Sequence, residues 1–439
     1  MEIFIKTVQL LLSLSILVIL HEFGHFFFAR LFKTRVEKFY LFFNPWFTLF
    51  KYKKGETEYG IGWLPLGGYV KISGMIDESM DKEAMAQPAK PWEFRSKPAW
   101  QRLMIMIGGV LVNFITAFFI YWMVLYTWGE QYIPVQSAKY GLYYHEVAKD
   151  LGLQNGDVVL KVDDHIVESS GDIARFILLE NAKELTVRRG SDQIQLSIPK
   201  GYDQKMIAEE VKLFADVRFP VVVKDLMSGS KADEAGLQTG DSIVTVNGQS
   251  TAFYNEFTNA LVENIEKDID VGIIRDNSPM TLNLTVPKSG KIGFYLVSVE
   301  NYVDIQRHEY GFWEACPKGI AKGLDILVGY VKQLRLIFTK EGAKQVGGFG
   351  AMGKLFPSTW NWYVFWSNTA LISMILAFMN ILPIPALDGG HVLFLLYEMV
   401  TGRKPGDKFM EYAQITGMIL LLGLLIFANG NDIFKAFIK

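Results

Sequence analysis

The residues best suited to catalysis lie together in the string His21-Glu22-Phe23-Gly24-His25. In a helix, two histidines four positions apart project from one face, so both imidazoles can reach a single metal ion. Glu22 lies on the same side of the turn and can deprotonate a water at that metal. The arrangement therefore predicts metal-assisted hydrolysis of a peptide bond, with Glu22 as general base and later as proton donor to the leaving amine.

This string lies inside an apolar segment, Ile3 to Phe28, that is long enough to cross a bilayer, a task that takes roughly 20 residues of helix. An ionisable group at mid-membrane costs on the order of 3 kcal/mol, and such groups are usually functional. Zinc binding contributes roughly 10 kcal/mol or more, which offsets the burial of the cluster. The alternative is that the histidines only pack between helices beside a protonated Glu22.

A metal site needs a third ligand, and the residues directly after His25 do not supply one. The chain has one cysteine, Cys316, so any ligands must come from His, Asp or Glu. The better candidate is Asp388, because the prolines before it break a helix at membrane depth. Irregular backbone is tolerated there only beside protein or water, which marks an interior cavity. Glu37 and His391 are the rival ligands.

Four segments are apolar enough to span a membrane, and they run over approximately Ile3–Phe28, Leu103–Trp128, Tyr363–Leu382 with an irregular continuation, and Ile415–Ala428. Basic residues gather between the first two spans and between the last two, which predicts that these loops are cytoplasmic. Both termini and the large segment from about 129 to 355 are then outside. The net charge of -2 shows no excess of basic residues of the kind that binds nucleic acid.

The outer segment contains an internal repeat, in which Gly152-Leu153-Gln154-Asn155-Gly156-Asp157 matches Gly236-Leu237-Gln238-Thr239-Gly240-Asp241. Each copy is followed by an alternating apolar strand and a turn, and the pattern resembles the PDZ domains of bacterial proteases. PDZ domains bind peptides by strand addition and hold a terminal carboxylate on backbone amides. This resemblance suggests Gly236, Leu237 and Gly240 as a peptide-binding loop; the alternative is that both domains are only filters or spacers.

Two further elements flank the spans. Residues Glu56 to Ser73 read as a short hairpin beside the first span, whose edge an extended substrate can join. The alternative is a hairpin that only plugs the membrane face. Between Phe312 and Phe338, apolar residues at helical spacing among lysines predict a helix on the outer membrane surface.

Two motifs together carry a family resemblance. The pairing of His-Glu-x-x-His in the first span with Asn-x-x-Pro-x-Pro-x-Leu-Asp-Gly-Gly in a later span resembles the site-2 family of intramembrane zinc metalloproteases. The two PDZ-like domains between the second and third of four spans are similar to the bacterial regulator-of-sigma-E protease type within that family. The resemblance covers nearly the whole chain.

The resemblance implies roles for several residues. His21, His25 and Asp388 would bind a zinc ion (Zn2+), and Glu22 would be the catalytic acid and base. Residues expected to contact or handle the substrate are Asn380, Pro383 and, with packing as the alternative, Asn113.

One loop departs from the family pattern. Phe42-Phe43-Asn44 stands where a Gly-x-Gly is common, which puts a tight glycine loop at the site in doubt. Gly60 and Gly62 in the hairpin are expected to compensate as substrate-binding positions.

The predicted fold is a polytopic α-helical membrane protein with four transmembrane helices, a cytoplasmic-side β-hairpin and two tandem PDZ-like α+β domains. The predicted parts are a first membrane half (1–128) that includes a cytoplasmic-side β segment (35–75), a first PDZ-like domain (129–217), a second (218–300), a surface linker (301–362) and a second membrane half (363–439).

The predicted function is regulated intramembrane proteolysis in a bacterial inner membrane. Expected partners are single-pass membrane substrates, such as a pre-trimmed anti-sigma factor or signal-peptide remnants, together with membrane lipid and peptides or C-termini bound by the PDZ domains. The rival hypotheses are a catalytically silent PDZ scaffold and an ion or metal transporter, since buried His, Glu and Asp also mark ion paths.

Overall fold

The computed structural model describes residues 2–75, 88–209, 211 and 213–438. The chain forms two compact units. One unit joins Met1–Gly129 to Glu309–Lys439 and contains the membrane-spanning helices, and the other is Glu130–His308.

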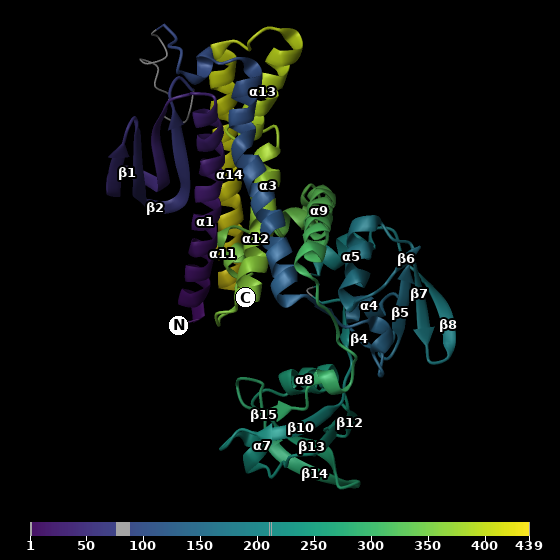
Figure 1. Ribbon diagram of the computed structural model, residues 1–439. Coiled ribbons are helices and arrows are strands. Elements are labelled where there is room, and N and C mark those ends of the chain that lie inside the picture. The colour runs from purple at the N-terminus through teal and green to yellow at the C-terminus, as the bar shows by residue number, and fades with distance from the viewer. Residues whose placement is uncertain (1, 76–87, 210, 212, 439) are drawn as a thin grey trace. The chain divides into compact units, whose positions relative to one another are not determined.

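Among the described residues, four helices of the first unit are long and apolar enough to cross a membrane, which agrees with the four predicted spans: α1 (Glu2–Leu31), α3 (Ala99–Trp128), α12 (Trp362–Ile381) and α14 (Asp407–Ile438). At a rise of about 1.5 Å per residue, each covers the roughly 30 Å of a bilayer core. A fifth helix, α13 (Asp388–Thr401), follows the break after α12. Figure 1 shows the spans side by side, with both chain ends at one end of the bundle and the α13 to α14 connection at the other.

Close packing of α1 on α3 depends on glycines. A Cβ atom at Gly24 would lie 2.2 Å from the Gly108 carbonyl oxygen, and one at Gly108 would lie 2.6 Å from the Gly24 oxygen. Helix backbones approach this closely only where small residues meet, as is common in membrane helix pairs. The contact lies next to His25, so it sets the distance between α3 and the predicted metal ligands.

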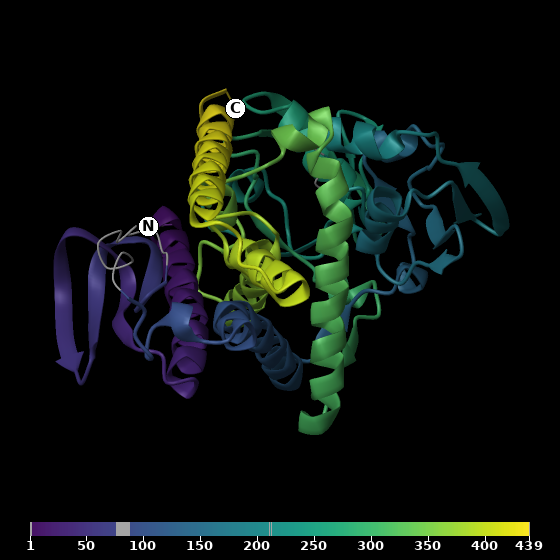
Figure 2. The ribbon, with the colours of Figure 1, turned by 90° about the horizontal axis from the view of Figure 1, so that it is seen from above.

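Helix α9 (Phe312–Ile337) crosses the direction of the spans, as Figures 1 and 2 show together. It touches α3 through Gly319 and Gly323, where a Cβ atom would meet the Trp122 backbone nitrogen at 2.6 Å or the Phe118 ring at 2.7 Å. Trp122 also donates its indole N–H to the Phe312 carbonyl. Two short helices follow, α10 (Lys340–Lys344) and α11 (Phe349–Gly353).

The predicted hairpin over Glu56–Ser73 is wrong in its pairing. Thr57–Ile72 is one strand, β2, and it pairs with the preceding strand β1 (Val36–Lys54). Phe39 of β1 faces both Tyr59 and Val70, so the first part of β1 lies between the two parts of β2. The second part of β2 then borders α1, because a Cβ atom at Gly68 would lie 2.7 Å from Val18 and 3.4 Å from Glu22. Sequence alternation could not reveal this non-local pairing.

The second unit contains two small α+β domains whose elements follow the same order along the chain apart from α6 in the first, although their sheets are joined differently. The first is built from β4 (Leu142–Tyr144), α4 (Glu146–Lys149), β5 (Val158–Val162), β6 (His165–Ile166), α5 (Ser170–Glu180), β7 (Glu184–Arg189), β8 (Asp192–Ser197), α6 (Tyr202–Ala208) and β9 (Ala215–Val217). The second is built from β10 (Val221–Leu226), α7 (Lys231–Glu234), β11 (Ser242–Val246), β12 (Gln249–Ser250), α8 (Tyr254–Glu263), β13 (Asp268–Arg275), β14 (Ser278–Thr285) and β15 (Phe294–Leu296). Strands β3 (Glu130–Tyr132) and β16 (Gln306–His308) pair where the unit begins and ends.

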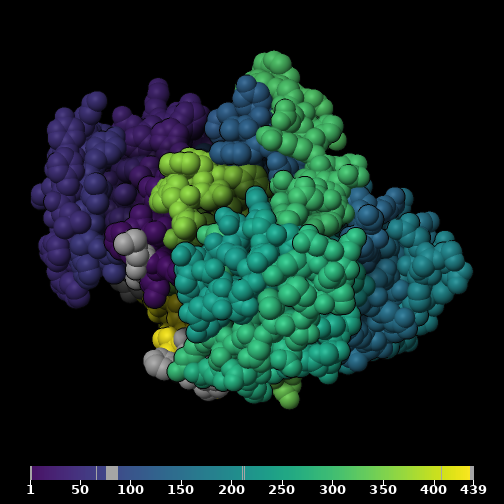
Figure 3. All heavy atoms as spheres, turned by 90° about the horizontal axis from the view of Figure 1, so that it is seen from below, coloured from purple at the N-terminus to yellow at the C-terminus, as the bar shows by residue number. Residues whose placement is uncertain are grey.

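The internal repeat extends to the side chains. Arg189 makes a two-pronged ion pair with Asp157 and also donates to the Gly152 carbonyl at 2.7 Å. In the second copy Arg275 does the same with Asp241, and it donates to the Gly236 carbonyl at 2.8 Å. Each of the two domains packs its own apolar core. Surface atoms of the second domain lie together on the face that Figure 3 shows.

Candidate metal centre

Helix α1 supplies two of the three residues that could hold a metal. His21 and His25 lie one helical turn apart, with their rings 4.9 Å apart in an edge-on arrangement. Their Nε2 atoms are 3.3 Å from each other. The four-residue spacing therefore brings both imidazoles to one point, as the sequence predicts.

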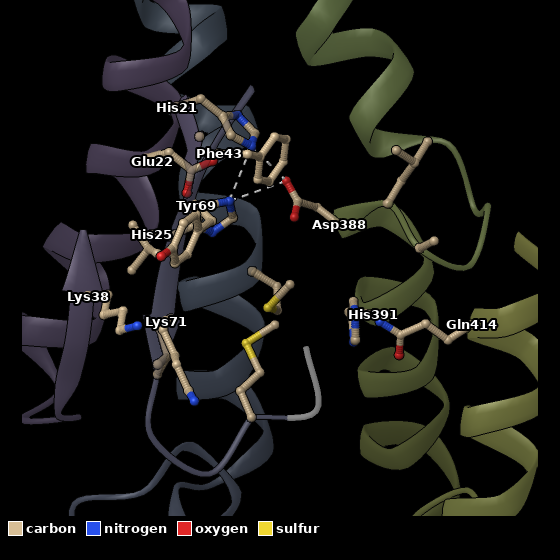
Figure 4. A pocket seen from close by; sticks show the side chains of 17 residues that line it. His21, Glu22, His25, Lys38, Phe43, Tyr69, Lys71, Asp388, His391 and Gln414 are labelled. Atoms are coloured by element: carbon tan, nitrogen blue, oxygen red, sulfur yellow. Dashed lines mark hydrogen bonds and ion pairs between the residues drawn. The ribbon is translucent and has the colours of Figure 1, made fainter. Parts of the chain in front are cut away.

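The third residue, Asp388, opens helix α13 directly after the backbone break. Residues 382–387 fold back over the first turn of α13, so a Cβ atom at Gly389 would lie 2.1 Å from the Leu382 carbonyl oxygen. At Gly417 of α14, a Cβ atom would lie 1.7 Å from the Pro385 oxygen. Glycine is required at both positions, and the resulting tight loop aims Asp388 at α1 (Figure 4).

The three donor atoms have the spacing of a zinc site. Asp388 Oδ2 lies 3.3 Å from His21 Nε2 and 3.4 Å from His25 Nε2. Zinc binds such atoms at about 2.0–2.2 Å, which separates tetrahedral ligands by about 3.3–3.6 Å. Among the described residues, Asp388 Oδ2 is buried and makes no well-aligned hydrogen bond despite its two close nitrogens. Three electron-pair donors thus converge on one point, which is the arrangement that a cation requires.

The outer contact of His25 also suits metal binding. Its Nδ1 atom lies 2.9 Å from the carbonyl oxygen of Ile105 in α3. A carbonyl oxygen can only accept a hydrogen bond, so Nδ1 must carry the ring proton. The proton on Nδ1 leaves the Nε2 lone pair for a metal, as in most histidine-ligated sites. Gly109, one turn further along α3, faces the same rings, since its Cβ would lie 2.4 Å from His25 Nε2.

Glu22 borders a cleft of about 460 Å³ that opens beside the three donors. The cleft is lined by α1, by the β1–β2 sheet, by α13 with α14, and by Met106 of α3. Figure 4 shows Lys38 and Lys71 on the sheet side, and His391 and Gln414 on the opposite side. Among the residues described, the metal-ligand group consists of His21, His25 and Asp388, and His391 is not part of it.

The structure separates the predicted substrate-contacting residues from the cleft. Gly60 packs under the Tyr40 ring and Gly62 against the Phe43 carbonyl, so both sit within the sheet. Gly68 and Tyr69 line the cleft in their place. Phe43, from the segment that departs from the family, also lines it, so this segment reaches the site without the usual glycines.

The remaining predicted residues have diverse surroundings. Asn380 is half-buried near the end of α12, and Pro383 is exposed in the break. Asn113 is fully buried and contacts His21 through its amide, which leaves it no access to a substrate in the cleft.

The predicted PDZ loop has a structural role in this arrangement. Leu237 is only 2% exposed and belongs to its domain's core. The Gly236 carbonyl accepts from Arg275, and Gly240 donates to the Val223 carbonyl.

Sequence reasoning named Asn113 only as a substrate contact, and it missed Ile105 and Gly109 of α3 and two residues of the sheet. Ile105, Gly109 and Asn113 recur every four residues on one face of α3, and that spacing was the available signal. Gly68 and Tyr69 gave no comparable signal, because their position depends on the pairing of β2 with β1.

Comparison with known proteins agrees with this geometry. The chain is 29% identical to the regulator of sigma-E protease RseP of Escherichia coli (strain K12), across 96% of this chain and 97% of that protein. It is equally similar to protease RseP of Yersinia pestis, with 29% identity and the same coverage. The family model described as peptidase family M50 matches residues 9–424. The two membrane motifs that suggested a site-2 protease thus meet in one metal-binding geometry, and the chain belongs to peptidase family M50.

Proposed function

We propose that this protein is a zinc-dependent endopeptidase that cleaves single-pass membrane proteins within the bilayer. The observation that carries the proposal is the convergence of His21, His25 and Asp388 at zinc-ligand spacing, beside a cleft inside the membrane bundle. Glu22 lines that cleft next to the donors, where a general base is needed.

The chain's own residues would divide the chemistry as follows. His21, His25 and Asp388 would hold zinc, which when bound polarises a carbonyl and makes water nucleophilic near neutral pH. A Glu22 carboxylate oxygen would take a proton from the attacking water and then pass it to the nitrogen of the departing amine. The apolar wall of α1 and α3 would limit entry of bulk water, which strengthens electrostatic interactions at the site.

The substrate would bind in an extended form. The second part of β2 lies next to α1, and Gly68 and Tyr69 line the cleft. A strand added to this edge would place its carbonyls near the three donors. A helical substrate must therefore unwind first, and we propose that Asn380 and Pro383 assist beside the break.

The fold and the relatives support a proposal for the substrate class and the cellular setting. We propose a bacterial inner membrane location, with both termini and the two small domains outside. The substrates would be an anti-sigma factor already cut outside the membrane, or signal-peptide remnants. The two small domains would act as PDZ domains that bind new C-termini or exclude untrimmed proteins by size.

Two rival functions make different demands on the chain. A catalytically silent scaffold does not require Glu22 next to a complete set of metal ligands. A transporter needs alternating access, usually through inverted repeats, and the four spans show no such repeat in the sequence. Transport of zinc without peptide cleavage would favour the second rival.

The test is cleavage of a single-pass model substrate by the purified protein in lipid nanodiscs. Wild type should cut within the apolar segment, as mapped by mass spectrometry. Glu22→Gln should keep its zinc but lose about 100-fold to 10,000-fold in rate, because it cannot accept a proton. Undiminished cleavage by Glu22→Gln, or a cut confined to the soluble part of the substrate, would overturn the proposal.

A further inference from the structure

Asn113 occupies a closed position on the far side of His21 from the cleft. Its side chain is fully buried, and its amide nitrogen lies 3.2 Å from His21 Nδ1. The amide oxygen of the same group is buried without a hydrogen-bond partner in the part of the chain that the structure describes. A fully buried amide with one unused end is costly, so it calls for a specific explanation.

The tautomer of His21 supplies that explanation. The Nε2 atom of His21 faces His25 and Asp388, so this atom would bind the metal and must keep its lone pair. The ring proton then resides on Nδ1, which needs an acceptor. The two ends of an amide have nearly the same shape, and a half-turn of the Asn113 amide brings its oxygen to Nδ1. That change gives the ring proton its acceptor, and it turns the amide N–H2 into the buried position that the oxygen occupied.

Helix α12 holds Asn113 in place. The Ser373 hydroxyl donates to the backbone carbonyl of Asn113 at 2.8 Å, and Ser373 is itself fully buried. On the same face of α3, eight residues earlier, the Ile105 carbonyl accepts from His25 Nδ1. Helix α3 therefore offers one oxygen acceptor to each of the two histidines.

We propose that Asn113 is a positioning residue of the metal centre. Its side-chain oxygen accepts the Nδ1 proton of His21, which fixes the ring orientation and leaves Nε2 available to zinc. This inference rests on the proposed zinc site and replaces the expected substrate contact of Asn113. Outer partners of this kind typically alter metal affinity by 10-fold to 100-fold.

The test measures zinc affinity by chelator competition in the full-length protein, in a Glu22→Gln background so that no activity enters the readout. Asn113→Leu, similar in size but without an acceptor, should raise the zinc dissociation constant about 10-fold to 100-fold. Asn113→Asp keeps an acceptor oxygen and should bind zinc at least as tightly as the parent. The visible spectrum of the cobalt-substituted protein should change in Asn113→Leu and be retained in Asn113→Asp.

The outcomes separate this inference from the proposed function. If the parent protein binds no zinc, the proposed function fails. If the parent binds zinc and Asn113→Leu binds it equally tightly, only the role of Asn113 is refuted. Should Asn113→Leu not assemble, Asn113→Asp decides, and a loss of more than about 10-fold in its zinc affinity would refute the role.

Discussion

Replacing Gly109 with alanine should disable the metal centre while leaving the membrane bundle intact. The added Cβ would lie 2.4 Å from His25 Nε2 and 2.6 Å from His21 Cε1, whereas ordinary contacts begin near 3.4 Å. The two rings must therefore move by about 1 Å, although metal–ligand distances tolerate only about 0.2 Å. Alanine also favours a helix over glycine by about 1 kcal/mol, so α3 itself should not weaken.

The expected loss is about 10-fold to 100-fold in zinc affinity and at least about 100-fold in cleavage rate, since a misplacement of 1 Å costs that much. Metal content, cleavage of a single-pass substrate and thermal unfolding would be measured on the same preparation. Gly423→Ala is the matched control, because its Cβ on α14 would meet nothing within 4 Å. It should retain zinc and activity. A Gly109→Ala protein with full zinc and normal cleavage would refute the placement of α3 against the two histidines.

Other predictions follow from single contacts. Arg102→Met should destabilise the membrane unit by about 1–3 kcal/mol, because it leaves the partly buried Glu398 unpaired. Thermal unfolding in detergent measures this, and adding Glu398→Leu should restore stability. Burial alone would raise the pKa of Asp241, but hydrogen bonds from Arg275 outweigh it and hold that pKa below its ordinary value. The ion pair therefore stabilises its domain above about pH 4, and this stabilisation is lost as the pH falls through the lowered pKa of Asp241. Arg275→Met should thus speed hydrogen exchange there at pH 7 and do so progressively less as the pH falls below that pKa. Gly68→Val should abolish cleavage but not zinc binding, since the side chain would project at the cleft edge towards α1; normal cleavage would argue against substrate binding at this edge.

The metal centre was predictable from sequence where its chemistry is local. His21 and His25 are related by one helical turn, and apolar length alone identifies the span that contains them. Asp388 was also within reach, because the proline break and the glycines after it are written in consecutive residues. Local patterns of this kind need no knowledge of tertiary contacts.

The surroundings of the centre were not predictable, because they depend on contacts between distant segments. Gly109 looks like any glycine in a membrane helix until α3 is packed on α1. The edge at Gly68 becomes visible only when β1 is inserted between the two parts of β2. In the outer unit, Arg189 and Arg275 lie 32 and 34 residues after their aspartates, so an exact repeat alignment does not pair them.

The departure of Phe42-Phe43-Asn44 from the family pattern has a structural answer. Phe42 adopts a φ of 67°, a left-handed conformation that glycine would take without strain. The following Phe43 side chain lines the cleft. The loop thus keeps a glycine-like backbone turn and adds an aromatic wall to the site.

The most direct test of the account is the zinc coordination sphere, measured by X-ray absorption spectroscopy on the purified full-length protein. The structure predicts two imidazole nitrogens and a carboxylate oxygen at about 2.0–2.2 Å, with no sulfur. In Asp388→Ala the carboxylate contribution and most of the bound zinc should disappear. A zinc sphere that contains sulfur, or one that is unchanged in Asp388→Ala, would contradict the account.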